Sequence, residues 1–218
     1  MRLPEVAIFD PDVTAALDKF LAEDEHLLTA RANAERAGGA VPVAPVTGAT
    51  LRFLAAAIGA RSVVEIGTGY GVSGLWLLRG MRAGSVLTSV DPEPEHHRMA
   101  KEAFTAAGLP TSRYRLITGR ALDVLPRLAD GAYDLVFCDA DKRELTDYLT
   151  AALRLLRPGG IVAFDNALWA DQGANVAHRD PETAMVSELR EQVAADDTLV
   201  PLLLPVGGGL LAAVKRQG

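Results

Sequence analysis

The sequence predicts an α/β protein with a mostly parallel sheet and helices on both faces. Strand-like runs alternate with helix-like periodic segments between Ser62 and Phe164, as expected for parallel strands joined by helices. Two more strand-like runs end the chain with only four residues between them. A connection this short favours an antiparallel hairpin, because a parallel crossover needs about a dozen residues or more. The prediction is therefore a seven-stranded sheet whose last strand is antiparallel.

The composition is that of a globular protein with one domain over residues 1–218. Of the 218 residues, 49% are hydrophobic and 23% are charged. The net charge of −6 gives no general attraction for nucleic acid or an anionic membrane, and no apolar run approaches the ~20 residues of a membrane span. The N-terminus lacks the apolar segment of a signal peptide, and the single cysteine, Cys138, cannot form an internal disulfide. These features favour a cytoplasmic protein.

Residues 1–40 are predicted to form a helical appendage to an α/β core over residues 41–218. Apolar residues recur at helical spacing over residues 12–37, and Gly38-Gly39 would end that helix. Its apolar stripe is broad enough to cover the site or a partner subunit. Its basic residues are interpreted as ordinary surface; they are Lys19, Arg31 and Arg36. A second helix is predicted over Thr47–Ile58.

Strands and helices then alternate along the core. The strands are predicted over Ser62–Ile66, Ser85–Val90, Arg113–Ile117, Tyr133–Cys138 and Gly160–Phe164. The helices between them are predicted over Val72–Arg82, Glu93–Ala107, Ala121–Leu128 and Arg143–Leu156. Asp180-Pro181-Glu182 provides an N-cap, a first-turn proline and an acid that the helix dipole favours, so a last helix begins there and runs to Ala194. The closing hairpin consists of Thr198–Leu204 and Gly209–Val214.

Two adjacent histidines, His96 and His97, lie in the helix that follows the second strand. They occupy adjacent faces of that helix rather than positions one turn apart, which is the spacing that two ligands on one helix need. We therefore expect them on a solvated helix surface.

Carboxylates and an amide follow two neighbouring strands of the predicted sheet. Asp139-Ala140-Asp141-Lys142 follows the fourth strand, and Asp165-Asn166 follows the fifth. Because the carboxyl ends of parallel strands face one crevice, Asp139, Asp165 and Asn166 are expected to converge. Three oxygen ligands without His or Cys suit a hard cation such as Mg²⁺ or Mn²⁺. Each of these residues alone is also a common cap of loops and helices, so the prediction rests on their combination.

A glycine-rich turn, Glu65-Ile66-Gly67-Thr68-Gly69-Tyr70-Gly71, follows the first strand and opens a helix. Glycines there let a ligand approach the backbone closely. Asp91 ends the second strand about 20 residues later, where an acid accepts hydrogen bonds from ribose hydroxyls. The run Gly69-Tyr70-Gly71-Val72-Ser73-Gly74 also fits a dinucleotide fingerprint, but it lies late relative to the strand and half inside the helix. The turn is therefore interpreted as a nucleoside site whose ligand carries no pyrophosphate.

Together these motifs resemble those of the class I S-adenosylmethionine-dependent methyltransferases, and more narrowly the cation-dependent O-methyltransferases of the catechol and caffeoyl-CoA type. The closer resemblance is carried by Val136-Phe137-Cys138-Asp139-Ala140-Asp141-Lys142 and by Asp165-Asn166-Ala167-Leu168-Trp169, and it extends from about Val41 to the C-terminus. It implies the family's Rossmann-like fold with an antiparallel last strand. It also implies a homodimer, S-adenosyl-L-methionine as cofactor and Mg²⁺ or Mn²⁺ as metal.

The resemblance also implies roles for the matching residues. Those that would line the path of the cofactor's methionine and adenosine are Val43, Glu65, Gly67, Thr68 and Ser73. Asp91 would hold the ribose, and Ala121 would lie against the adenine. Asp139, Asp165 and Asn166 would hold the cation, while Asp139 and Asp141 would also touch the cofactor.

Lys142 matches the family's general base, although a solvated lysine at the start of a helix also explains it. Methyl transfer from a sulfonium is an in-line displacement, so the acceptor oxygen must be a good nucleophile. A cation chelated by two neighbouring acceptor oxygens lowers their pKa and orients one of them. A lysine then takes the proton if its site depresses its pKa. The chain departs from the family pattern at Arg143-Glu144-Leu145, beside the acceptor.

The sequence thus predicts an enzyme that methylates a hydroxyl of a small catechol-like or phenolic acceptor, with neither membrane nor nucleic acid as a partner. One alternative is an enzyme of the same fold that methylates a hydroxylated uridine of transfer RNA, for which a local basic rim would suffice. Another is a cofactor-binding protein without catalysis, which is disfavoured by the intact set Asp139, Asp165, Asn166 and Lys142. A nicotinamide-dependent oxidoreductase is disfavoured by the position of the glycines and by the Asp–Asn set.

Overall fold

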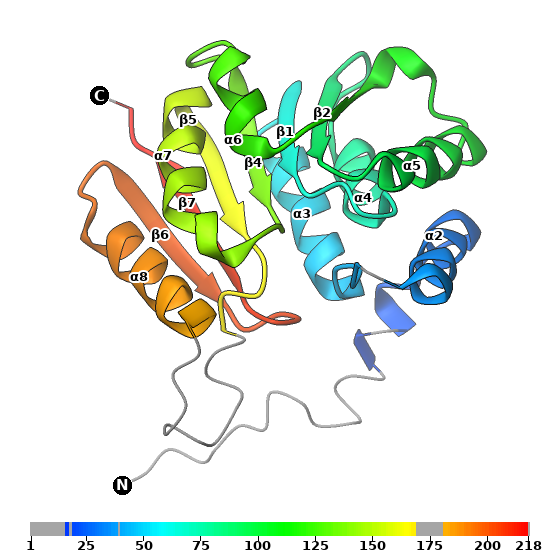
Figure 1. Cartoon of the computed structure of the whole chain (residues 1–218), viewed down its shortest axis with the longest axis horizontal. Helices are drawn as coiled ribbons and strands as arrows, with labels where there is room; N and C mark the ends of the chain where they lie inside the picture. The colour runs from blue at the N-terminus through cyan, green and yellow to red at the C-terminus, as the bar shows by residue number, and fades with distance from the viewer. Residues whose placement is uncertain (1–15, 18, 39, 169–180, 218) are drawn as a thin grey trace, which may run out of the picture.

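The computed structural model describes residues 16–17, 19–38, 40–168 and 181–217, and these form one seven-stranded sheet between two layers of helices (Figure 1). The strands are β1 Ser62–Ile66, β2 Val86–Asp91, β3 Tyr114–Thr118, β4 Tyr133–Cys138, β5 Leu156–Phe164, β6 Leu199–Leu204 and β7 Leu210–Lys215. Their order in the sheet is β3-β2-β1-β4-β5-β7-β6. Strands β1 to β5 pair in parallel, and β7 runs antiparallel to both β5 and β6. The predicted architecture is confirmed.

Helices cover both faces of the sheet. One layer consists of α2 Glu25–Ala37, α3 Pro45–Ala57, α4 Val72–Gly80 and α5 Pro94–Ala106; the other consists of α6 Ala121–Val124, α7 Leu145–Leu155 and α8 Pro181–Ala195. In the central strand β4, Leu135 and Phe137 belong to the hydrophobic cluster that includes residues of α2 to α5, while Val136 and Cys138 belong to the cluster that includes residues of α6 to α8. The strand is buried on both sides, as expected for a parallel sheet covered by helices. None of the described helices is long and apolar enough to cross a membrane.

The prediction of one helix over residues 12–37 is wrong, because residues 22–24 are not helical and α2 begins at Glu25. The side chain of Asp24 accepts hydrogen bonds from the backbone nitrogens of His26 and Leu27, both at 3.1 Å, and so caps a new helix start. The predicted stop at Gly38 is confirmed, with φ at 70° and its N–H donating to the Ala34 carbonyl. Residues 12–15 and 18 lie outside the described part of the chain.

The expectation that Arg31 of α2 is an ordinary surface residue is wrong. Its guanidinium donates to the Glu23 carboxylate from Nε at 2.8 Å and from Nη2 at 2.7 Å, and Nη2 also donates to the Val43 carbonyl at 2.9 Å. Asp24 forms an ion pair with Arg79 of α4 at 2.6 Å. These contacts fasten α2 to the core and to the segment before α3.

Other element boundaries also differ from the prediction. β5 begins at Leu156 rather than at Gly160. Its pairing register with β4 shifts between Tyr133 and Leu135, and this irregularity allows the strand to include Pro158 and Gly159. The helix predicted from Arg143 begins as a 3₁₀ turn over Lys142–Glu144 and becomes α-helical at Leu145. That turn places Lys142 directly beyond β4.

Candidate active site

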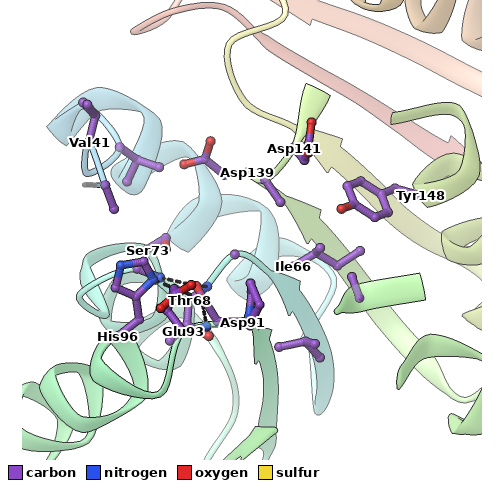
Figure 2. A pocket seen from close by; sticks show the side chains of 18 of the residues that line it. Val41, Ile66, Thr68, Ser73, Asp91, Glu93, His96, Asp139, Asp141 and Tyr148 are labelled. Atoms are coloured by element: carbon purple, nitrogen blue, oxygen red, sulfur yellow. Dashed lines mark hydrogen bonds and ion pairs between the residues drawn. The ribbon is translucent and has the colours of Figure 1, made fainter. Parts of the chain in front are cut away.

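A cavity of about 970 Å³ opens at the carboxyl ends of β1, β2 and β4. The chain leaves β1 for β2 on one side, while β4 lies on the other side, so the cavity occupies the point where the strand order reverses. The segments that line it include residues 40–43, the turn after β1, the residues that follow β2, the start of α6 and the residues that follow β4. Figure 2 shows Ser73, Thr68 and Asp91 on one side of this cavity and Asp139, Asp141 and Tyr148 on the other.

The glycine turn after β1 passes the end of β4 at very close range. Gly67, Gly69 and Gly71 have φ values of 94°, 47° and 84°, a region that other residues rarely adopt. A Cβ on Gly67 would lie 2.0 Å from the carbonyl oxygen of Asp139. Glycine is therefore required here, and Gly67 and Gly69 line the cavity with bare backbone.

The carboxylate of Asp91 organises this turn. Its Oδ2 accepts hydrogen bonds from the backbone nitrogens of Thr68 at 3.0 Å and Gly69 at 3.1 Å. Its Oδ1 accepts from the Glu93 backbone nitrogen at 2.9 Å and contacts His96 Nδ1 at 3.0 Å (Figure 2). Asp91 lines the cavity from the end of β2, so the acid expected to meet a ribose is held in place by four protein donors.

A buried chain of hydrogen bonds lies behind the turn. Glu65, which is fully buried, accepts from Ser73 Oγ at 2.6 Å and from Ser89 Oγ at 2.5 Å. Ser89 Oγ in turn contacts Thr68 Oγ1 at 2.6 Å. Thr68 and Ser73 line the cavity, whereas Glu65 is not among the residues that line it. Burial raises the pKa of Glu65 to about 7.

The expectation of a solvated surface for His96 and His97 is wrong. The His97 ring is buried between Thr68 Oγ1, 3.1 Å from Nε2, and Thr118 Oγ1, 2.9 Å from Nδ1. Its burial lowers the pKa of the imidazole. His96 reaches back to Asp91, five residues earlier, and packs against the Tyr70 ring. The sequence feature that could have predicted these contacts is the short separation between the two histidines and Asp91, the acid that ends β2.

A Glu65→Gln variant is expected to change how stability depends on pH. The pKa of Glu65 is raised from 4.5 to about 7, so the native protein retains a proton that the unfolded chain has already released. As the pH rises from 4.5 to about 7, the free energy of unfolding of the wild type therefore falls relative to that of the variant. The fall is roughly 3 kcal/mol at most. Urea unfolding of both proteins near pH 5 and pH 8, with chelator present, measures this change. A stability difference that is the same at both pH values would contradict it.

The structure brings together the three predicted cation ligands. Cys138 and Phe164 are paired at the ends of β4 and β5, so Asp139 and Asp165, which follow them, lie side by side. Asn166 Nδ2 donates to Asp139 Oδ1 at 3.2 Å. Burial raises the pKa of Asp139 to about 6, and burial together with the Asp139 charge raises the pKa of Asp165 to about 7. Two neighbouring, partly buried carboxylates call for a positive partner.

The donor set fits a divalent cation. Asp165 Oδ1 is buried and has no hydrogen-bond partner in the described part of the chain. Buried polar atoms are rarely left in that state, and a bound ion is one of the usual reasons. No group of three His, Cys, Asp or Glu with metal-binding geometry occurs among the described residues, so the candidate set consists of two carboxylates and one amide. Oxygen ligands of this kind suit Mg²⁺ or Mn²⁺.

Lys142 and Asp141 line the cavity beside these carboxylates. The positive charge of Lys142 opposes the rise in the pKa of both Asp139 and Asp165, which places the amine within electrostatic range of the pair. Asp141 accepts from Arg143 Nε at 2.9 Å and from Nη2 at 2.5 Å, and this ion pair holds the pKa of Asp141 below its usual value. Asp141, expected at the cofactor, is thus already paired within the protein.

The remaining predicted residues also lie at the cavity. Val43 and Ala121 are both buried and line it, Val43 before α3 and Ala121 at the start of α6. Where the sequence departs from the family pattern, Glu144 accepts from Arg120 Nη2 and from Tyr148 Oη, each at 2.6 Å. That ion pair spans the cavity rim between the start of α6 and the segment after β4. Trp169, the last residue of the motif that carries the family resemblance, lies outside the described residues.

Comparisons with known proteins agree with this geometry. A family model described as O-methyltransferase matches residues 15–216. A protein of Mycobacterium ulcerans named as an O-methyltransferase is 49% identical over 204 residues, which cover 93% of this chain and 90% of the relative. Among solved structures, the O-methyltransferase TomG of Streptomyces achromogenes, involved in tomaymycin synthesis and solved in complex with SAM, is 30% identical with a TM-score of 0.84, covering 94% of this chain and 96% of its own. Cofactor-bound Rv0187 from MTB is 33% identical with a TM-score of 0.86, covering 95% and 98%.

Proposed function

Because the chain belongs to the O-methyltransferase family, we propose that it methylates a hydroxyl of a small catechol-like or phenolic acceptor in a reaction that requires a divalent cation. It is an S-adenosylmethionine-dependent enzyme, as its membership and its cofactor-bound relatives indicate. The observation that supports the cation is the partly buried pair Asp139 and Asp165, in which one carboxylate oxygen of Asp165 is buried without a hydrogen-bond partner in the described part of the chain.

The cofactor would lie along the glycine turn. S-adenosylmethionine supplies an electrophilic methyl group on its sulfonium. Gly67 and Thr68 would face its methionine part, with Ser73 held in place by Glu65. Asp91 would hold the ribose, and Ala121 would lie against the adenine. These residues would bind the cofactor and orient its methyl group for transfer.

The acceptor would lie between Asp139 and Lys142. A cation bound there lowers the pKa of a chelated acceptor hydroxyl and fixes its direction. Asp139, Asp165 and Asn166 would hold that cation, and Lys142 Nζ would accept the hydroxyl proton as the methyl group is transferred. By holding the cation, these carboxylates would help to orient the acceptor for methyl transfer.

One apolar residue that lines the cavity is almost fully exposed. Val41 lines the cavity although its side chain is 91% exposed, so it offers an uncovered surface to a bound ring (Figure 2).

The proposed function is tested by a screen of catechols, flavonoids and transfer RNA with labelled cofactor and Mg²⁺. Label in a vicinal dihydroxy aromatic supports the proposal. Label found in transfer RNA alone would establish instead a nucleic-acid-modifying enzyme of the same fold.

We also propose that the enzyme is a homodimer that buries the N-terminal segment. Phe20 and Leu28 leave 85% and 54% of their surfaces exposed, although α2 is fastened to the core on its other side. Exposed apolar groups gathered on one segment mark contact surfaces. Sedimentation at micromolar concentration is expected to give a dimer, and Phe20→Asp with Leu28→Asp is expected to give monomers. A wild-type monomer would refute this proposal.

A further inference from the structure

The turn between β6 and β7 packs directly against the residues that follow β5. Ala167 N donates to the Gly209 carbonyl at 2.8 Å, and Leu168 N donates to the Gly208 carbonyl at 2.9 Å. Gly209 N closes the turn on the Val206 carbonyl at 2.8 Å. These bonds join two segments that are about forty residues apart in the sequence, immediately beyond the candidate cation ligand Asn166.

The turn presents bare backbone to that ligand. A Cβ on Gly208 would lie 2.4 Å from Asn166 Oδ1 and 3.2 Å from its Cα and Cγ. On the other side, a Cβ on Gly207 would lie 2.5 Å from Thr47 Oγ1 and 3.1 Å from the Ala44 Cβ. The turn is therefore wedged between the start of α3 and Asn166, and only residues without side chains leave room for both.

Asn166 itself has an unfavourable backbone conformation. Its φ is 63°, and no other non-glycine residue in the described ranges has a positive φ. Such conformations persist where the surroundings impose them, and they concentrate at functional sites. The two hydrogen bonds from Ala167 and Leu168 to the glycine turn impose it here, and the Asn166 amide then reaches Asp139 at 3.2 Å.

We propose that Gly208 is a positioning residue of the cation site, because the space left by its missing side chain sets the direction of the Asn166 amide. This inference rests on the proposed role of Asp139, Asp165 and Asn166 as cation ligands. Gly208 touches neither cofactor nor acceptor in it. It acts only through Asn166, much as the outer partners of metal ligands do elsewhere.

Gly208→Ala tests the inference with little other disturbance. The φ of Gly208 is not positive, so alanine adds a methyl group without backbone strain. That methyl group would displace the Asn166 amide oxygen. We expect the affinity for Mn²⁺, measured by electron paramagnetic resonance of the free ion, to fall by about 10-fold or more. Affinity for S-adenosylhomocysteine, measured by calorimetry, is expected to stay within about 2-fold of the wild type, since the glycine turn after β1 is untouched.

Two further variants identify the route of the effect. Gly84→Ala is the control for a general loss of stability: its φ is 74°, so alanine strains the backbone there, but a Cβ meets nothing within 4 Å and the residue precedes β2 at the opposite end of the sheet. It is expected to keep wild-type Mn²⁺ affinity. In an Asn166→Ala background, Gly208→Ala is expected to have no additional effect, because the group it displaces is gone.

The outcomes separate this inference from the proposed function. A wild-type protein that binds no Mn²⁺ would overturn both. Normal Mn²⁺ binding by Gly208→Ala would overturn the inference alone. So would a loss that persists undiminished when Asn166 is already alanine, since the effect would then not pass through the amide.

Discussion

Replacing Asp165 by alanine is expected to abolish methyl transfer, with a loss of about 10³-fold or more. A cation that lowers the pKa of the acceptor hydroxyl contributes several kcal/mol to the transition state, and each 1.36 kcal/mol is about tenfold in rate. Asp165 lies beside Asp139, and its Oδ1 is buried without a partner in the described part of the chain, so its removal takes away one of the two carboxylates proposed to hold the cation. Initial rates with labelled cofactor, saturating Mg²⁺ and catechol measure the loss.

Cofactor binding distinguishes this effect from general damage to the site. Asp165→Ala is expected to bind S-adenosylhomocysteine about as tightly as the wild type, because Asp165 follows β5 and the cofactor would lie over β1 and β2. Asp91→Ala is expected to do the opposite and weaken that binding by about 1.5–3 kcal/mol, the range for hydrogen bonds to a charged group. Calorimetry measures both. Substantial turnover by Asp165→Ala at low Mg²⁺ would show that the carboxylate is not a ligand.

Lys142→Met is expected to lower the turnover number by about 10²-fold or more, because the variant keeps the apolar stem and loses the amine that accepts the proton. Lys142 lies at the cavity wall near both Asp139 and Asp165, within range of an acceptor held by those carboxylates. Single-turnover rates with enzyme in excess separate the chemical step from product release.

The acidity of the acceptor decides what Lys142 does. A nitrocatechol releases its proton more readily than catechol, so the loss caused by Lys142→Met is expected to be smaller with the nitrocatechol if the amine is a general base. Arg143→Met is a suitable control, since Arg143 is the next residue and pairs with Asp141 rather than with the cation ligands. An equal loss for both acceptors would mean that Lys142 positions the substrate instead.

The sheet could be predicted because its signals are local. The runs of β1 and β4 are apolar, bounded by polar residues and separated by helical periodicity, and the short connection between β6 and β7 permits only a hairpin. The convergence of Asp139 with Asp165 follows from the same reasoning, since adjacent parallel strands end at one edge.

Features that depend on contacts distant in sequence could not be predicted in this way. The interruption of the helix before α2 depends on Asp24. From the sequence alone, Asp24 is equally compatible with a surface position within a helix, and only its pairing with Arg79 shows otherwise. Arg31 gives no sequence signal for its bond to the Val43 carbonyl. The burial of His97 likewise depends on hydroxyls of β3 and of the glycine turn, Thr118 and Thr68.

The turn at Gly207-Gly208-Gly209 illustrates the same limit. In the sequence it is only a flexible connection, whereas in the structure its lack of side chains is matched to Asn166 and to Thr47. A glycine required by close packing is indistinguishable in sequence from one required by backbone conformation. Only the folded arrangement shows that Gly208 belongs to the first kind.

The central claim is that methyl transfer depends on a divalent cation held by Asp139, Asp165 and Asn166. The most direct test starts from metal-free enzyme in excess chelator and raises the concentration of free Mg²⁺ in steps. At each step the initial rate of labelled methyl transfer to catechol is measured. The expected result is no transfer in chelator and a saturable recovery with Mg²⁺ or Mn²⁺. An undiminished rate of transfer in excess chelator would contradict the claim.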